Sequence, residues 1–156
     1  SSRSAAAMPP SKPQTAHLMA SPDDVEAQFY EALREGDIDK LMALWSDDDD
    51  VVCVHPGGPR VVGVLAIRSA FEAVFAAGHI VAQAEQVRRV HALDCAVHSV
   101  VERISITTTE GQREGFVIAT NVYLRTSQGW RMVAHHASPG TPSELQEVGD
   151  VPQVLH

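Results

Sequence analysis

Apolar residues recur at helical spacing in three segments of the first half of the chain. Residues 21–24 (Ser-Pro-Asp-Asp) supply an N-cap, a proline at the first helical position and acids in the first turn, so a helix begins there. Gly36 ends this helix and Asp37 caps a second one, while a third is predicted from Val64 to Ala77. The apolar stripes are Val25, Phe29, Ala32 and Leu33; Ile38, Leu41, Met42 and Trp45; and Val64, Ile67, Phe71, Val74 and Phe75.

The pattern changes to that of β-strands after Gly78. A short strand is predicted at residues 51–55, before the third helix, and a Pro-Gly-Gly-Pro turn directly follows this strand. Four long strands are predicted at residues 79–90, 95–107, 114–125 and 130–138. Their short connections favour antiparallel pairing. We therefore expect an α+β fold, a cone-shaped roll in which a curved antiparallel sheet packs against three N-terminal helices and leaves one end open for a small molecule.

The domain organisation follows from composition along the chain. At 156 residues the chain fits one domain. Residues 1–20, rich in Ser, Ala and Pro, are predicted to form a flexible leader, and residues 21–138 the folded domain. Residues 139–156 are predicted to form an irregular C-terminal tail.

Charge and cysteine content narrow the function classes. The formal net charge of −8 argues against nucleic acid and anionic membrane surfaces as partners, and no apolar run approaches the roughly 18 residues of a membrane span. Cys53 and Cys95 lie in apolar strand segments without Cys-x-x-Cys spacing, which favours buried thiols over a catalytic cysteine. Reduced thiols are typical of a cytoplasmic protein. Small organic molecules and other proteins remain as the candidate binding partners.

The last predicted strand combines packing residues with polar chemistry. Side chains alternate between the two faces of a strand, so the adjacent His135 and His136 must point in opposite directions. Parity groups His136 with Trp130, Met132, Ala134 and Ser138. We expect one histidine to face a protected interior and the other to face solvent or a partner.

The strand at residues 95–107 carries a further acid. His98 and Glu102 share one face with Val100 and Ile104, and parity leaves open whether this face looks into the cone. Glu102 is a reserve candidate for an acid near the pocket, although an exposed sheet charge is the favoured alternative.

Three short motifs, in this order, suggest a family. They are Leu33-x-x-Gly36-Asp37-x-x-x-Leu41-x-x-Leu44-Trp45, Gly63-x-x-x-Ile67 and Gly129-Trp130-Arg131. Together with the element order they resemble the nuclear transport factor 2-like (NTF2-like) superfamily, within it the SnoaL-like and ketosteroid isomerase-like proteins, over roughly Pro22 to Ser138. The superfamily includes isomerases, cyclases, hydrolases, dehydratases and association domains, so the resemblance is more specific for fold than for function.

The resemblance implies a set of site residues. His55, before Pro56, stands where the isomerases carry their acidic general base, and Asn121 stands where they carry a second oxyanion donor. His136 would be a third polar group of the cavity. The pocket lining implied by the resemblance and by parity is Phe29, Tyr30, Trp45, Trp130, Met132 and Ser138. Each histidine also has a structural alternative. His55 could hydrogen-bond to the backbone at the turn, and His136 could satisfy a neighbouring strand or Asn121. For Trp45, a place in the core is favoured over a role as a ligand platform.

The expected function is small-molecule binding, with an isomerase, cyclase or dehydratase using His55 as general base. Steroid isomerisation is disfavoured, because Phe29 replaces a phenol and the Asn121 amide is a weaker donor. No organic cofactor is expected, since no phosphate-cradling glycine loop is present, and no metal, since a site with His55, His136 and a carboxylate lacks compact ligand spacing. The alternative is a non-catalytic interaction module with a residual pocket. In either case we expect a homodimer formed through the sheet.

Overall fold

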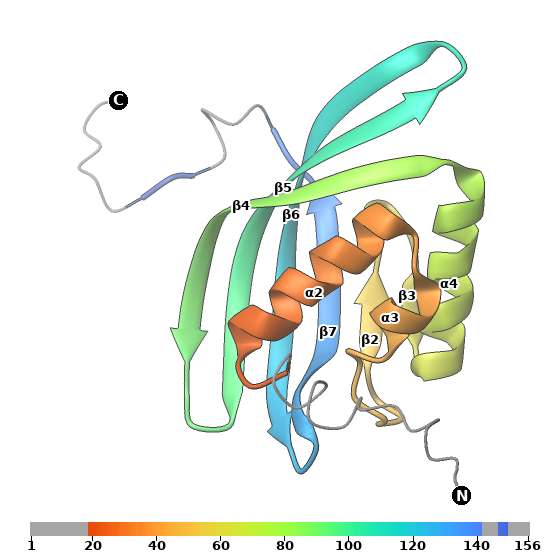
Figure 1. Ribbon diagram of the computed structural model, residues 1–156. Helices are drawn as coiled ribbons and strands as arrows, with labels where there is room; N and C mark the ends of the chain where they lie inside the picture. The colour runs from red at the N-terminus through yellow and green to blue at the C-terminus, as the bar shows by residue number, and fades with distance from the viewer. Residues whose placement is uncertain (1–18, 142–146, 150–156) are drawn as a thin grey trace, which may run out of the picture.

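The protein is seen as a computed structural model that describes residues 19–141 and 147–149. Helices α2 (Pro22–Glu35), α3 (Ile38–Met42) and α4 (Val64–Ala77) accompany one six-stranded sheet (Figure 1). Among the described residues no helix combines the length and apolar character needed to cross a membrane. The three helices predicted from the sequence are confirmed, and the third has the predicted bounds.

The sheet has the order β3-β2-β7-β6-β5-β4. Its strands are β2 (Val52–Val54), β3 (Arg60–Val62), β4 (His79–His91), β5 (Cys95–Thr108), β6 (Gly111–Thr126) and β7 (Gly129–Pro139). All neighbours pair antiparallel except β2 and β7, which run parallel. The predicted α+β arrangement is confirmed, with this parallel pair as a refinement. The β5–β6 hairpin extends beyond the helices and leaves one end of the sheet uncovered by them (Figure 1).

Local sequence explains where the first two helices begin and end. The Ser21 hydroxyl accepts a hydrogen bond from the Asp24 amide at 3.1 Å, and the Asp37 carboxylate accepts one from the Lys40 amide at 3.0 Å. Gly36 has a φ of 65°, a left-handed conformation that few residues other than glycine adopt without strain. These caps fix the reversal between α2 and α3.

A bulge in β7 decides which of its side chains face the helices. Tyr123 of β6 pairs with Met132, but its neighbour Val122 pairs with Ala134, so Val133 is an extra residue on β7. An extra residue shifts the alternation of every side chain beyond it. Met132 therefore faces inward on one side of the bulge, and His135 faces inward on the other.

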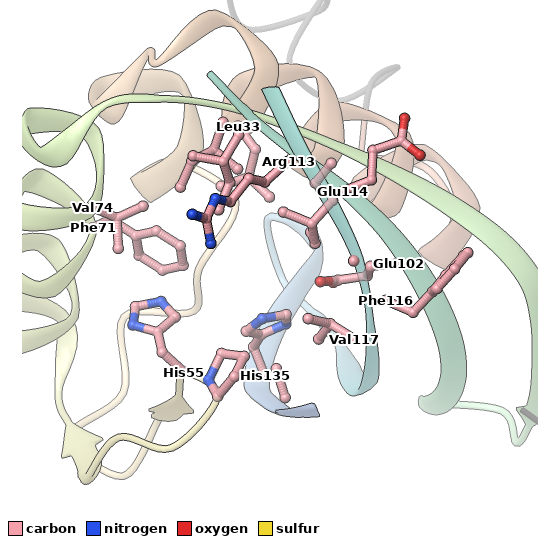
Figure 2. Close-up of a pocket in the computed structure, with 17 residues that line it drawn as sticks. Leu33, His55, Phe71, Val74, Glu102, Arg113, Glu114, Phe116, Val117 and His135 are labelled. Atoms are coloured by element: carbon pink, nitrogen blue, oxygen red, sulfur yellow. The ribbon is translucent and has the colours of Figure 1, made fainter. Parts of the chain in front are cut away.

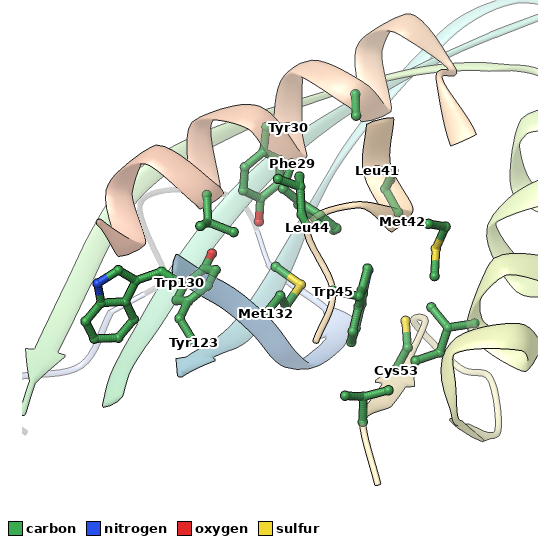
Figure 3. Close-up of a cluster of buried hydrophobic side chains, with 14 of the residues drawn as sticks. Phe29, Tyr30, Leu41, Met42, Leu44, Trp45, Cys53, Tyr123, Trp130 and Met132 are labelled. Atoms are coloured by element: carbon green, nitrogen blue, oxygen red, sulfur yellow. The ribbon is translucent and has the colours of Figure 1, made fainter. Parts of the chain in front are cut away.

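The hydrocarbon core lies between α2, α3 and the sheet (Figure 3). Trp45 and Met132 are buried and form an isolated bridge that ties the segment after α3 to β7. Trp130 is 9% exposed and packs in the same cluster. The core fills this part of the cone with side chains.

The ends of the folded domain reach slightly beyond the predicted 21–138. Met19 is buried, and its carbonyl accepts a hydrogen bond from the Trp130 amide at 2.9 Å, so it is part of the fold and not of a leader. Pro139 ends β7, and the Gly140 amide donates to the Phe116 carbonyl at 2.8 Å. The remainder of the predicted leader, residues 1–18, and residues 142–146 and 150–156 of the predicted tail lie outside the described residues.

Candidate functional site

A pocket of about 430 Å³ opens where the β5–β6 hairpin leaves the helices (Figure 2). Its walls come from the end of α2, the residues after β2, the second half of α4, and β4 to β7. The lining residues are Leu33, His55, Pro56, Phe71, Val74, Ile80, Ala82, Glu102, Ile104, Ile106, Arg113, Glu114, Gly115, Phe116, Val117, His135 and Ala137. Most are apolar. His55 and Glu102 lie on opposite sides of His135 (Figure 2).

Glu102 is the acid inside this pocket. Its side chain is only 4% exposed, and its Oε2 accepts a hydrogen bond from the Tyr30 hydroxyl at 2.5 Å. Burial raises the pKa of the Glu102 carboxyl to about 7; the Tyr30 hydrogen bond opposes this shift and the nearby Glu26 adds to it. Near neutral pH this carboxyl is therefore partly protonated, and it can both donate and accept a proton.

His55 lies at the end of β2, at the mouth of the pocket. Its ring meets the Phe71 ring edge-on with centroids 4.8 Å apart, and its Nε2 lies 3.7 Å from the Cys53 sulfur. Desolvation lowers the pKa of His55, so the imidazole is neutral at pH 7. The turn after it is closed by backbone, the Gly58 amide donating to the His55 carbonyl at 2.8 Å, which leaves the ring to the pocket.

Cys53 does not supply a nucleophile to this site. It is fully buried, and burial raises the pKa of its thiol to about 12. A thiol that stays protonated at neutral pH is unreactive. The prediction of a buried cysteine is confirmed at this position.

His135, and not His136, is the histidine of β7 that enters the pocket. His135 is 4% exposed, its ring centroid lies 6.5 Å from that of His55, and desolvation lowers its pKa to about 3. His136 and Ser138 are exposed on the other face. The prediction that these two residues line the cavity is wrong, because the extra residue Val133 reverses the alternation assumed for a regular strand.

Asn121 lies behind the pocket wall. It is fully buried, its Oδ1 lies 2.6 Å from His135 Nδ1, and its Nδ2 donates to the Tyr30 hydroxyl at 3.1 Å. It does not line the cavity. Asn121 therefore joins the two buried polar groups that do, His135 directly and Glu102 through Tyr30.

Glu26 of α2 is the shared hydrogen-bond acceptor of this buried network. Its Oε2 accepts hydrogen bonds from the Tyr123 hydroxyl at 2.9 Å and from Asn121 Nδ2 at 3.4 Å, and it lies 2.9 Å from His98 Nδ1. Sequence reasoning missed Glu26. Its spacing could have identified it: Glu26 comes four residues before Tyr30 and seven before Leu33, so helical periodicity places this acid on the side of α2 that faces the sheet.

The other predicted lining residues occupy places outside the cavity. Phe29 lies against the His135 ring with centroids 5.2 Å apart, and Tyr30 lies beneath Glu102. The predicted lining residues Trp45, Trp130 and Met132 belong to the core (Figure 3). None of these five side chains lines the pocket. Core side chains fill the part of the cone where strand alternation predicts the ligand, and the pocket lies further along the sheet.

One group of potential metal ligands occurs among the described residues. Asp23, Glu26 and His98 have ligand-type atoms within 4.8 Å of one another. Asp23 pairs with Arg89 at 2.8 Å, and Glu26 already accepts the hydrogen bonds of the buried network. Protein partners account for this cluster without an ion.

Comparisons with known proteins agree with this architecture. The model of the SnoaL-like domain family matches residues 23–142. No curated protein matches the chain.

Several solved structures are similar to this chain. A Thiobacillus denitrificans protein, provisionally named a calcium/calmodulin-dependent protein kinase type II association domain, is 35% identical with a TM-score of 0.72, over 79% of this chain and 98% of its own. A provisionally assigned dehydratase of the NTF2-like family from Streptomyces avermitilis is 30% identical with a TM-score of 0.69, over 76% and 92%. An NTF2-like superfamily protein from Salmonella enterica, at 12% identity, has a TM-score of 0.69 over 88% and 99% and supports the fold alone.

Proposed function

The chain belongs to the SnoaL-like domain family, with an NTF2-like fold, and on that premise we propose that its pocket binds a small, mainly apolar organic molecule and catalyses proton transfer on it. The class of reaction is a cofactor-independent isomerisation or elimination. The single observation that carries this proposal is Glu102, a buried acid with a pKa of about 7 in an apolar pocket that also holds the neutral His55.

The two groups suit the two halves of an enolisation. Neutral His55 accepts the proton of a carbon next to a carbonyl, as its general base. Protonated Glu102 gives its proton to the carbonyl oxygen, because Tyr30 already donates to Oε2 and the proton sits on Oε1. The resulting enol returns its O–H proton to Glu102, while protonated His55 delivers its proton either to another carbon of the conjugated system, giving an isomer, or to the departing group, giving elimination.

The Streptomyces avermitilis relative favours this class. It is provisionally assigned as a dehydratase, it is 30% identical, and this chain covers 92% of its length. Dehydration next to a carbonyl begins with the same removal of a proton from carbon. The likeness supports the reaction class.

The test is carbon-acid exchange on a panel of small apolar ketones, followed by proton NMR in deuterium oxide. We expect His55→Ala and Glu102→Gln each to lower the exchange rate about 100-fold or more, with folding largely intact. The matched control is His136→Ala, on the opposite sheet face, which should keep the rate of the unmodified protein. Exchange that persists in both pocket variants would refute the roles of His55 and Glu102.

A second candidate function is dimerisation through the outer face of the sheet. On this face Ile118 is half-buried and Leu124 is 39% exposed in the single chain, while Val101, which pairs with Ile118, is already buried. The relative that is 35% identical is provisionally named an association domain. We propose that a second copy of this chain covers the outer face. Light scattering coupled to size-exclusion chromatography tests this, and a monomer throughout the micromolar range would contradict it.

A further inference from the structure

The buried network behind the pocket holds His135 in one tautomer. We propose that His135 is the pocket's hydroxyl-recognition residue: Nδ1 carries the proton, and Nε2 is a fixed acceptor that selects uncharged ligands bearing a hydroxyl group. The proposal rests on the proposed binding of a small molecule in this pocket and adds the chemical class of that molecule.

The orientation of the Asn121 amide is the first step. Glu26 Oε2 accepts hydrogen bonds, so the group that Asn121 presents to it must be the NH₂. The same NH₂ donates to the Tyr30 hydroxyl, whose own proton is directed to Glu102. Reversing the amide would place its oxygen against the Glu26 carboxylate, which is electrostatically unfavourable. The amide oxygen therefore faces His135.

The His135 tautomer follows from that orientation. An amide oxygen can only accept, so Nδ1, 2.6 Å away, must carry the proton. A second proton on Nε2 would make an imidazolium, which burial and the adjacent His55 and His136 oppose, consistent with the lowered pKa of His135. Nε2 therefore presents a lone pair.

No described side chain satisfies this lone pair. Nδ1 is committed to Asn121, and His135 lines the pocket, so Nε2 is the ring nitrogen left for a ligand. The walls beside it are mostly apolar. A ligand with an O–H donor satisfies the acceptor, whereas a ligand without one leaves it unpaired in a desolvated site.

The charged residues of the pocket add a second criterion: Arg113 and Glu114 of its lining carry opposite charges, and Glu102 is the acid next to His135. Glu102 is buried beside His135 on the inner face, and its described hydrogen bond is to the uncharged Tyr30. An anionic ligand group placed here would repel the ionised form of Glu102 and would pay for its own desolvation. The ligand class is thus an uncharged hydroxy ketone, with its carbonyl toward Glu102 and its hydroxyl toward His135. A hydroxyl held by an acceptor is not protonated for departure, so this group is retained through the reaction.

Binding of matched probes tests the selection. The probes are the aromatic-ring isomers of hydroxytetralone, each paired with its methyl ether, titrated calorimetrically at about pH 6, where Glu102 with its pKa of about 7 is mostly protonated. We expect at least one hydroxytetralone to bind about tenfold more tightly than its ether. In His135→Phe, which keeps an aromatic ring and removes the acceptor, that ratio should fall close to one while the ether still binds.

Three outcomes of the titrations overturn the proposal. They are equal binding of every hydroxyl and ether pair, a hydroxyl preference that survives in His135→Phe, and no binding of any hydroxytetralone. The titrations require no turnover. If the protein shows the His135-dependent preference for the hydroxyl ligand but catalyses no reaction, the proposed catalysis alone is refuted. If it catalyses a reaction but shows no such preference, this inference alone is refuted.

The tautomer is tested independently by nitrogen NMR of the imidazole rings. In the unmodified protein we expect the His135 signals of an Nδ1–H tautomer, unchanged between about pH 5 and 8 because its pKa is about 3. Asn121→Leu removes the acceptor that holds this form, so its ring signals should shift toward the Nε2–H tautomer. An Nε2–H tautomer or an imidazolium in the unmodified protein would overturn the proposal, whether or not Asn121→Leu folds.

Discussion

Two rows of side chains cross the same three strands one residue apart, and they have opposite environments. The inner row is His98, Asn121 and His135, and the outer row is Ser99, Thr120 and His136. Every member of the inner row is buried, and every member of the outer row is exposed. In the single chain the outer row is open to solvent, whereas the inner row depends on partners supplied by α2.

The difference shows where this protein concentrates polar interactions that are costly to disturb. A buried polar group that loses its partner keeps its full desolvation cost, while an exposed one turns to water. Glu26 and Tyr30 of α2 complete the inner row and connect it to Glu102. Substitutions should therefore have large effects on the inner face and small effects on the outer face.

The largest expected effect comes from Glu26→Leu. This change leaves His98 Nδ1, the Tyr123 hydroxyl and Asn121 Nδ2 without their shared acceptor. We expect the free energy of unfolding to fall by about 3 to 5 kcal/mol, measured by urea denaturation at neutral pH. Thr120→Ala on the outer row is the matched control, with a change of about 0.5 kcal/mol or less. Similar losses in both variants would contradict the contrast between the rows.

The next effect is a pH-dependent stabilisation by Glu102→Gln. Folding raises the pKa of Glu102 from 4.5 to about 7, so the native state binds more protons, and the contribution of this group to stability is present below pH 4.5 and lost as pH rises through 7. Relative to the unmodified protein, the variant should gain about 3 kcal/mol between pH 4.5 and 8. Gln can still accept the Tyr30 hydrogen bond.

His135 has the opposite slope, which makes the difference between variants the informative quantity. Its pKa falls to about 3 in the native state, so its contribution is present above pH 6.5 and lost as pH falls toward 3. This term is common to both proteins and cancels in the comparison. A difference in stability that stays constant from pH 4.5 to 8 would show that Glu102 is not perturbed.

The contrast between the faces also separates what the sequence could predict from what it could not. Helix caps such as Ser21 and Gly36, and the alternation in the long strands, depend on neighbouring residues, and these elements were predicted within a few residues. The bulge at Val133 arises from pairing with β6, which is distant in sequence, so strict parity placed His136 inside instead of His135.

The position of the pocket was likewise beyond local patterns. The sequence predicts a pocket position for His55 and favours an exposed charge for Glu102, with a reserve acid as the alternative; both residues belong to the pocket lining. Deciding the face of Glu102 requires knowing that Tyr30 from α2 lies against it. The predicted lining also included Met132 and Trp45, although the core was favoured for Trp45, and the packing of the segment after α3 onto β7 encloses both in the core.

The smallest effect on folding is expected from Thr120→Lys. Thr120 is exposed at the middle of the outer row, so a lysine should change the free energy of unfolding of a single chain by about 0.5 kcal/mol or less. If a second copy covers this face, the buried charge should convert the dimer to a monomer. Light scattering measures this, with His55→Ala, in the pocket, as the control that keeps the dimer. A Thr120→Lys dimer as stable as the original would exclude this face.

The most direct measurement is the titration of Glu102 itself, by carbon NMR of protein labelled at the glutamate carboxyl carbons. Glu102→Gln identifies the signal by its disappearance. We expect a midpoint near pH 7, and a further upward shift in Tyr30→Phe, which removes the hydrogen bond that lowers it. A midpoint below pH 5 would mean that the inner face holds an ordinary solvated carboxylate and no acid suited to proton transfer at neutral pH.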